Sequence, residues 1–253
     1  MAASDSRRRG RASSIAPVQA SVLTRRRPRR QASEEPRVRT FRLMALLALS
    51  AIVSIAEAQE LRLPFEDRWF VAQGGDTINV NHHMALRAQW FGIDFAKVGG
   101  PSNRELAVPN PARPEDFYSW GQHVLAPSDG EVVAVVNDLP DNPLGVKDTS
   151  RPAGNYVSIK IGPDRFLFLA HFQRGSIVVK RGERVSRGQA IGRCGNSGNS
   201  DFPHIHLHIQ DQPAFNSGQG QMSVFGNIDV ELSGKSFQRV TWPLIRGLFV
   251  SPR

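Results

Sequence analysis

The chain has 253 residues and a formal net charge of +9 at pH 7. This length is enough for one well-packed core with a small extension. The positive charge is uneven, because residues 1–58 hold 12 arginines and four carboxylates, a balance of +8 that leaves only +1 for residues 59–253. A nearly neutral folded part excludes a basic nucleic-acid-binding face, and we expect no nucleic-acid partner.

The N-terminal region has the layout of an export signal. Residues 1–42 are rich in Arg, Ser, Ala and Pro and are expected to be disordered or to precede the true translation start, for which Val38 is one candidate. Residues 43–58 form a short apolar run after this basic stretch and end in AEA, the order of a secretory signal peptide. We expect a mature chain that begins at Gln59, is periplasmic or secreted, and has no stable membrane insertion after signal cleavage. An uncleaved N-terminal anchor is the alternative.

The exported part has the composition of strands separated by turns. Segments rich in β-branched and aromatic residues predict strands at residues 131–136, 156–161, 165–172 and 204–209. Turn dipeptides separate these segments, and none of them shows sustained helical periodicity. The expected fold class is mainly β, an antiparallel sheet of barrel-sandwich type with long loops.

Two long irregular stretches interrupt the predicted strands. Residues 96–121 and 137–154 are rich in Pro, Asn, Asp and Gly, and loops of this length in a compact domain are usually functional rims or mobile. As rims, the two loops could wall a groove for an extended peptide. From Gln212 onward, further strand-like pieces predict a C-terminal β extension over residues 212–253. The expected organisation is a main domain at residues 59–211 followed by this extension.

Cys194 is the single cysteine, so an internal disulfide bond is impossible. It lies in the glycine-rich stretch RCGNSGNS. A small buried thiol in a tight turn is a commoner role for such a residue than that of a nucleophile. Without disulfides, the exported protein must be stabilised by its core or by a metal.

The stretch DFPHIHLHIQD at residues 201–211 places histidines at alternate positions, His204, His206 and His208. In a β-strand, successive side chains point to opposite faces. The aliphatic residues between the histidines would therefore be buried, and the three imidazoles would line the other face.

Four further polar residues are candidates to meet that face. His171 ends the apolar strand FLFLAHF, and Asp94 lies between apolar neighbours in WFGIDF, with His82 and His83 twelve and eleven residues before it. A carboxylate in an apolar context is costly unless it is paired, hydrogen-bonded or bound to a metal. Neutral imidazoles together with a carboxylate are a usual ligand set of zinc.

A family resemblance is carried by segments that span roughly residues 69–211: NHHMALRAQWFGIDF, VLAPSDGEVVAVV, GNYVSIKI, FLAHF, VKRGERVSRGQAIGRCGNSGNS and PHIHLHIQ. In this order they resemble the zinc metallopeptidases of the lysostaphin/LytM type, peptidase family M23, which cut peptidoglycan cross-bridges. The resemblance implies a LytM-like peptidase domain at residues 59–211 with one zinc ion per chain. It also implies that His83, Asp94 and His206 are the metal ligands and that His171 and His204 are catalytic histidines that do not bind the metal.

The sequence departs from the commonest family pattern at one position. That pattern has the first histidine four residues before the aspartate, where this chain has Trp90. The chain instead resembles a long-spaced branch with an Asn-x-His segment, which points to His83, with His82 as the fallback. His208 stands where the family usually has Glu or Gln, and both a supporting role behind the metal ligand and an exposed position without a role are open.

The expected function is that of an exported zinc-dependent endopeptidase that hydrolyses peptide bonds in peptidoglycan stems or cross-bridges. Peptidoglycan peptides are thus the expected partners, and the oligomeric state is left open. The alternative from another class is a metal-free or inactive M23-like regulator that activates a cell-wall amidase, although such relatives typically lack one of the five site residues. A phosphocarrier or lipoyl-like barrel shares APSDGEVV and GQAIG, but those proteins are cytoplasmic, and a lipoyl domain needs a lysine on a hairpin tip.

Overall fold

Antiparallel strands dominate the structure, a computed structural model that describes residues 60–253. The predicted signal peptide at residues 43–58 and the cleavage site before Gln59 lie outside the described residues. Within residues 60–253, no helix has the length and apolar character needed to cross a bilayer. The fold class predicted from the sequence, mainly β with an antiparallel sheet, is confirmed.

Two sheets and three short helices make up the described part of the chain. The strands are β1 (Trp69–Gln73), β2 (Ile93–Lys97), β3 (His123–Leu125), β4 (Gly130–Val136), β5 (Asn155–Gly162), β6 (Arg165–Phe172), β7 (Arg184–Val185), β8 (Ala190–Arg193), β9 (Ile205–Gln210), β10 (Gly220–Gln221), β11 (Phe225–Leu232), β12 (Lys235–Trp242) and β13 (Phe249–Pro252). The 3-10 helices are η1 (His82–Ala85), η2 (Arg87–Gln89) and η3 (Pro114–Asp116). All four strands predicted from the sequence are present, as β4, β5, β6 and β9.

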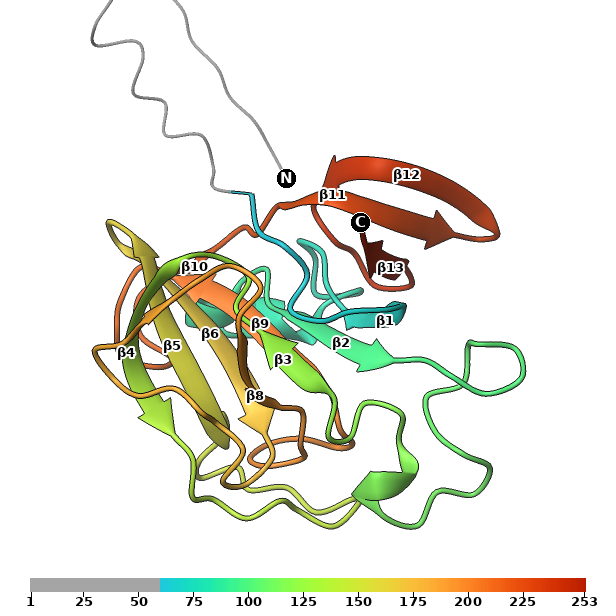
Figure 1. Ribbon diagram of the computed structural model, residues 1–253, viewed down its shortest axis with the longest axis horizontal. Coiled ribbons are helices and arrows are strands. Elements are labelled where there is room, and N and C mark those ends of the chain that lie inside the picture. Colours follow the sequence, from blue (N-terminus) through green and yellow to red (C-terminus); the bar gives the residue numbers. More distant parts are fainter. Residues whose placement is uncertain (1–59) are drawn as a thin grey trace, which may run out of the picture. The chain divides into compact units, whose positions relative to one another are not determined.

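The large sheet has the strand order β12-β11-β13-β1-β2-β9-β6-β5-β4-β7, and β10 also pairs with β9. Figure 1 shows β2, β9 and β6 side by side in this sheet, while β3 and β8 form the separate two-stranded sheet. The central position of β9 decides which side chains meet. Asp94 is the register partner of His206 on one side of β9, and Ala170 is its partner on the other.

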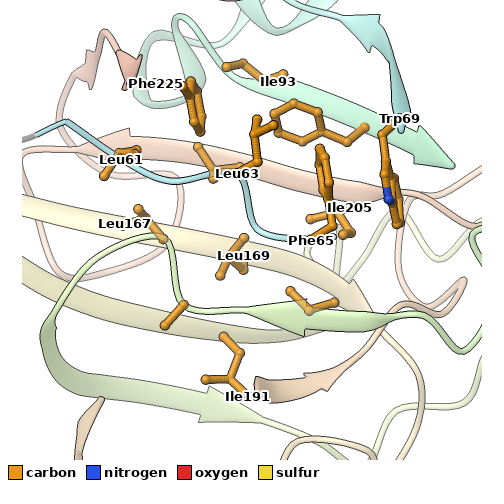
Figure 2. Close-up of a cluster of buried hydrophobic side chains, with 14 of the residues drawn as sticks. Leu61, Leu63, Phe65, Trp69, Ile93, Leu167, Leu169, Ile191, Ile205 and Phe225 are labelled. Carbon is orange, nitrogen blue, oxygen red and sulfur yellow. The ribbon is translucent and has the colours of Figure 1, made fainter. Parts of the chain in front are cut away.

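Strict alternation along β9 separates its core face from its polar face. Ile205, Leu207 and Ile209 are at most 1% exposed and belong to the main hydrophobic cluster. Figure 2 shows labelled members of this cluster, which come from the segment before β1 and from β1, β2, β6, β8, β9 and β11. Full burial of one such side chain stabilises the fold by about 1.5–3 kcal/mol. The same packing restrains β9, so the polar side chains on its other face are held in place.

The predicted C-terminal extension continues the large sheet at its edge. Strand β13 pairs with both β1 and β11, and β12 pairs with β11 as the outermost strand. Most residues of β12 are exposed on both faces. The extension joins the sheet strand by strand, because the open edge of β1 offers backbone groups that β13 pairs with.

Candidate metal centre

Three side chains from three elements meet at one point, where two imidazoles contact the same carboxylate oxygen of the third residue. Asp94 of β2 is 5% exposed, and its Oδ1 lies 3.0 Å from Nε2 of His83 in η1. The same Oδ1 lies 3.0 Å from Nδ1 of His206 in β9. These are the three residues that the family resemblance implied as metal ligands, and the fold brings them together although up to 123 positions separate them along the chain.

Local structure explains how His83 reaches this point. Asn81 caps η1, because its side-chain oxygen accepts a hydrogen bond from the backbone N–H of His83 at 3.2 Å. Its amide nitrogen donates to the carbonyl oxygens of Gly75 and Gly92, which ties the helix to the start of β2. A Cβ at Gly92 would lie 3.0 Å from the imidazole Cγ of His83. The Asn-x-His segment therefore works as a positioning unit, and glycine is needed where the ring passes the backbone.

The structure also brings His82 near the carboxylate. His82, His83 and Asp94 each offer a ligand atom within 4.8 Å of the others, and the two imidazole centroids are 4.1 Å apart. Burial distinguishes the two histidines, because His82 is exposed and His83 is 6% exposed. The distances to Asp94 and the burial both favour His83 as the ligand.

The spacing of the converging atoms fits a small tetrahedral cation. Zinc binds imidazole nitrogen and carboxylate oxygen at about 2.0–2.2 Å, so two ligand atoms of one tetrahedral site lie roughly 3.3 Å apart. In the described part of the chain, Nε2 of His83 is also buried, and its 3.0 Å contact with Oδ1 of Asp94 lacks the geometry of a hydrogen bond. A buried polar atom without a partner is costly, and a metal–ligand bond would remove that cost. His83, Asp94 and His206 therefore fit zinc.

The charge states of the converging groups are suited to metal binding. Burial alone would raise the pKa of Asp94, but the neighbouring His83 and His204 hold it well below its usual range. Burial lowers the pKa of His206 to about 3, with the nearby His83 acting in the same direction. The site thus presents an ionised carboxylate and a neutral imidazole, the forms in which both groups bind metals.

His171 reaches the cleft through a bulge in β6. On β6, Tyr156 pairs with Ala170 and Asn155 with Phe172, so His171 is an extra residue between two ladder pairs. Its backbone has φ +64°, in the left-handed region that non-glycine residues rarely adopt. In an unbroken strand His171 would share the core face with Leu169. The bulge brings it into the lining of the cleft instead.

Two backbone carbonyls orient the second pair of imidazoles. Nδ1 of His171 lies 2.8 Å from the carbonyl oxygen of Ser197, and Nδ1 of His204 lies 2.8 Å from that of Phe202. A carbonyl oxygen only accepts, so each Nδ1 carries a proton, and in a neutral ring Nε2 is then the nitrogen with the free lone pair. The ring centroids are 4.7 Å apart, and Nε2 of His204 lies 3.6 Å from Oδ1 of Asp94. Burial, together with His204 and His206, keeps the pKa of His171 well below its usual value.

The GNSGNS turn holds the carbonyl that orients His171. The Ser197 hydroxyl donates to the carbonyl oxygen of Phe172 at 2.8 Å and accepts from the backbone N–H of Asn155 at 2.9 Å. A Cβ at Gly154, whose φ is +59°, would lie 2.4 Å from the backbone of Ser197. In the sequence this motif served only to mark the family resemblance. In the structure it holds the carbonyl group that orients His171.

His208 lies behind His206 and is fully buried, so the exposed position that the sequence left open is wrong. Nε2 of His206 and Nδ1 of His208 are 2.8 Å apart, and Nε2 of His208 is 3.1 Å from Oε1 of Gln210. Burial lowers the pKa of His208 to about 4. Sequence reasoning missed Gln210, although it continues the same alternation two positions further along β9.

A cavity of about 460 Å³ opens over these residues and is lined by the five predicted site residues together with His82. One wall comes from the loop 137–154, through Lys147, Pro152 and Ala153. The other loop, 96–121, lines no part of this cavity. Backbone hydrogen bonds such as Gly99 to Glu105 and Val108 to Asp116 fold it back on itself.

Cys194 is 1% exposed, lies within the hydrophobic core cluster and does not line the cavity. Burial raises the pKa of its thiol. A thiol that resists ionisation is a poor nucleophile. The interpretation of Cys194 as a buried structural residue therefore agrees with the structure.

Comparison with known proteins shows which proteins the chain is similar to. The sequence model of Peptidase family M23 matches residues 116–220, a range that contains His171, His204 and His206 but neither His83 nor Asp94. The peptidoglycan DD-endopeptidase ShyA of Vibrio cholerae is 44% identical over 57 residues, which are 22% of this chain and 13% of that protein. A metalloprotease of Haemophilus influenzae is 32% identical over 120 residues, 45% of this chain and 22% of that protein.

Among solved structures, the catalytic domain of lysostaphin from Staphylococcus simulans is similar with 20% identity and a TM-score of 0.36, over 60% of this chain and 86% of that domain. The chain spans less than a quarter of the length of either curated relative. The segment matched by the family model, residues 116–220, contains β6, the GNSGNS turn and β9, and with them His171, His204 and His206. Residues 116–220 of the chain thus match the model of peptidase family M23, in agreement with the resemblance seen in the sequence.

Proposed function

We propose that the protein is an exported zinc-dependent endopeptidase that hydrolyses peptide bonds in peptidoglycan stems or cross-bridges. The observation that carries the proposal is the convergence of His83, Asp94 and His206 at 3.0 Å contacts, with His171 and His204 facing the same cavity. The family match supports peptidase activity, and the similarity to a peptidoglycan DD-endopeptidase supports the substrate class. In this proposal residues 59–211 are the peptidase domain and residues 212–253 a β extension.

His83, Asp94 and His206 would hold one zinc ion per chain and leave a position open to the cavity. The chemistry that zinc supplies in such a site is Lewis-acid polarisation of the scissile carbonyl and acidification of a water molecule. Asp94 contributes the single negative charge, and the two ligand imidazoles are neutral. The cavity volume of about 460 Å³ leaves room for a short stretch of extended peptide beside these residues.

His171 and His204 have the geometry of a general acid–base pair. Both present an unprotonated Nε2, so one of them accepts the proton of the attacking water. The other takes up a proton from solvent, donates a hydrogen bond to the developing oxyanion and passes that proton to the leaving amine, while the base releases the water's proton to solvent. The carbonyl oxygens of Ser197 and Phe202 accept from Nδ1–H at 2.8 Å and stabilise the imidazolium that forms. No serine or cysteine nucleophile is required.

The test is digestion of purified peptidoglycan with the purified protein, with mass spectrometry of the products. New amino groups should be released by zinc-loaded protein, a chelator should abolish the release, and added zinc should restore it. The mass of the fragments identifies the cut bond. Zinc-loaded protein that releases no amines from peptidoglycan of several cross-link types, yet stimulates a separate amidase, would overturn the proposal in favour of a regulator.

A further inference from the structure

Three polar side chains stand in line behind the candidate metal ligand of β9. His206, His208 and Gln210 occupy alternate positions on one face of the strand, and none is more than 3% exposed. Contacts of 2.8 Å and 3.1 Å join them in sequence. Gln210, at the end of this line of contacts, is buried and contacts the protein backbone. The donor and acceptor of each hydrogen bond along the line can therefore be assigned.

The direction is set at the Gln210 end. The amide nitrogen of Gln210 lies 2.6 Å from the carbonyl oxygen of Gln212 and 2.6 Å from that of Ala214. Carbonyl oxygens only accept, so both contacts require the NH₂ group, and the two N–H bonds of the amide are used. The other end of the amide, Oε1, must then face His208. An oxygen of this kind only accepts, so Nε2 of His208 carries the proton and donates it.

The protonation of His208 in turn decides which nitrogen of His206 carries a proton. Its ring stacks on Phe168 with centroids 5.0 Å apart and an angle of 2°, and Phe215 lies against it at 5.7 Å. A charged imidazole is costly in this aromatic environment. A neutral imidazole has one N–H, so Nδ1 of His208 is an acceptor, and it accepts from Nε2–H of His206 at 2.8 Å.

The consequence at His206 is an unprotonated Nδ1 that faces Oδ1 of Asp94 at 3.0 Å. Two acceptor atoms at this distance repel each other, and a cation bound between them would convert the repulsion into attraction. We propose that Gln210 and His208 are positioning residues that hold His206 in its Nε2–H tautomer, so that Nδ1 is ready to bind metal before any metal arrives. This inference rests on the proposed zinc site and extends it to two residues that do not touch the metal.

The direct test is the tautomeric state of each histidine in the metal-free protein, read by long-range ¹H–¹⁵N NMR of the ¹⁵N-histidine-labelled chain. His206 and His208 should be Nε2–H tautomers, whereas His171 and His204 should be Nδ1–H tautomers. The exposed His123 is the internal control and should average between both forms. A proton on Nδ1 of His206 or of His208 would overturn the inference. This readout needs neither zinc nor activity, so a wild-type protein that binds no zinc would contradict the proposed function alone.

Variants test the link to metal affinity. Replacement of outer-sphere partners of metal ligands typically lowers metal affinity 10–100-fold. His208→Leu, which removes the acceptor, should weaken zinc binding by that factor in a competition titration with a chelator. His208→Gln restores an acceptor and a donor and should recover most of the affinity, and His123→Gln should match the wild type. Unchanged zinc affinity in His208→Leu would overturn the inference.

The same variants distinguish a positioning role from a merely structural one. Gln210→Leu removes the acceptor at the end of the line but leaves His206 and His208 in place. His206 should then populate both tautomers in the metal-free protein, a change that a loss of packing would not produce. A Gln210→Leu protein that folds and keeps a single Nε2–H tautomer at His206 would show that the direction is set elsewhere. If either variant fails to fold, the wild-type NMR measurement still decides the inference.

Discussion

His206 and Asp94 are register partners across the β2–β9 ladder, and their side chains meet at 3.0 Å between Nδ1 and Oδ1. The backbone pairing of two strands therefore sets the distance between two candidate ligands. Side chains on rigid neighbouring strands lose little conformational freedom when they bind a common partner. His83 completes the set from a short 3-10 helix, and it is the one ligand whose position depends on local capping.

The first prediction concerns the choice between the two adjacent histidines. His83→Ala should lower zinc affinity more than roughly 100-fold, because it removes a buried ligand rather than an outer-sphere partner. His82→Ala should retain most of the metal, since that ring is exposed. Metal analysis after dialysis against a weak chelator measures both. If His82→Ala loses zinc and His83→Ala keeps it, the ligand assignment is wrong even though the family is right.

The second prediction separates metal binding from proton transfer at His171. His171→Asn should keep one zinc per chain and lose activity by roughly 10²–10⁴-fold, the usual contribution of a general acid or base. Asparagine is the suitable replacement, because it tolerates the left-handed φ of +64° better than alanine does. Zinc content and kcat are the measurements. Activity within a few-fold of wild type would remove His171 from the mechanism.

The third prediction concerns acid stability of the metal-free protein. The pKa of His171 in the folded state lies well below its usual value because of burial and the nearby His204 and His206. Between the unfolded value of about 6.5 and the lower folded value, the unfolded chain binds more protons, so the free energy of unfolding falls as the pH falls. Above about pH 6.5 this residue contributes no pH dependence.

Urea unfolding at pH 7.5, 6 and 5 with chelator present measures the effect. His171→Asn should show a shallower loss of stability with acid, because the titrating group is gone while the backbone geometry is kept. Equal pH dependence in both proteins would show that His171 does not contribute to acid unfolding.

The fourth prediction is that Cys194 is inert in the folded state. Its thiol is buried and its pKa is raised, so iodoacetamide should label it only after denaturation. Activity should survive treatment of the native protein with the reagent. Rapid labelling of native protein accompanied by loss of activity would return Cys194 to the list of candidate nucleophiles.

The fifth prediction is that the exported chain begins at Gln59. The motivation is the basic stretch, the apolar run and the small residues AEA that precede this position. N-terminal sequencing of protein from the extracytoplasmic fraction measures it directly. A chain that retains residues 43–58 would indicate an uncleaved anchor.

Alternation made the face of β9 predictable, because Ile205, Leu207 and Ile209 mark the core side and the polar side chains follow from the period of two. The same rule fails at His171, which by alternation belongs with Leu167 and Leu169 on the core face. The bulge that redirects it consists of one extra residue and leaves no pattern in the sequence. Strands that depend on long-range pairing were also not predicted from the sequence. Short strands such as β1 carry too few residues to show a period, and they are stabilised by their partners.

The position of His83 was predictable only through the family. Its approach to Asp94 depends on the Asn81 cap and on the close passage of Gly92. Both are contacts between segments about eleven residues apart in the chain, and no local sequence pattern shows them. Gln210, by contrast, was within reach of the sequence, because it extends the same polar face by one further step.

The strand order has a consequence for the timing of folding. β13, at residues 249–252, lies between β11 and β1, and β1 in turn pairs with the strand that carries Asp94. Contacts between segments so far apart in the chain form late and slowly. During synthesis, the sheet beside the candidate metal site cannot close until these residues have emerged. A chain organised in this way would complete its candidate metal site only after most of its residues have left the machinery that makes it.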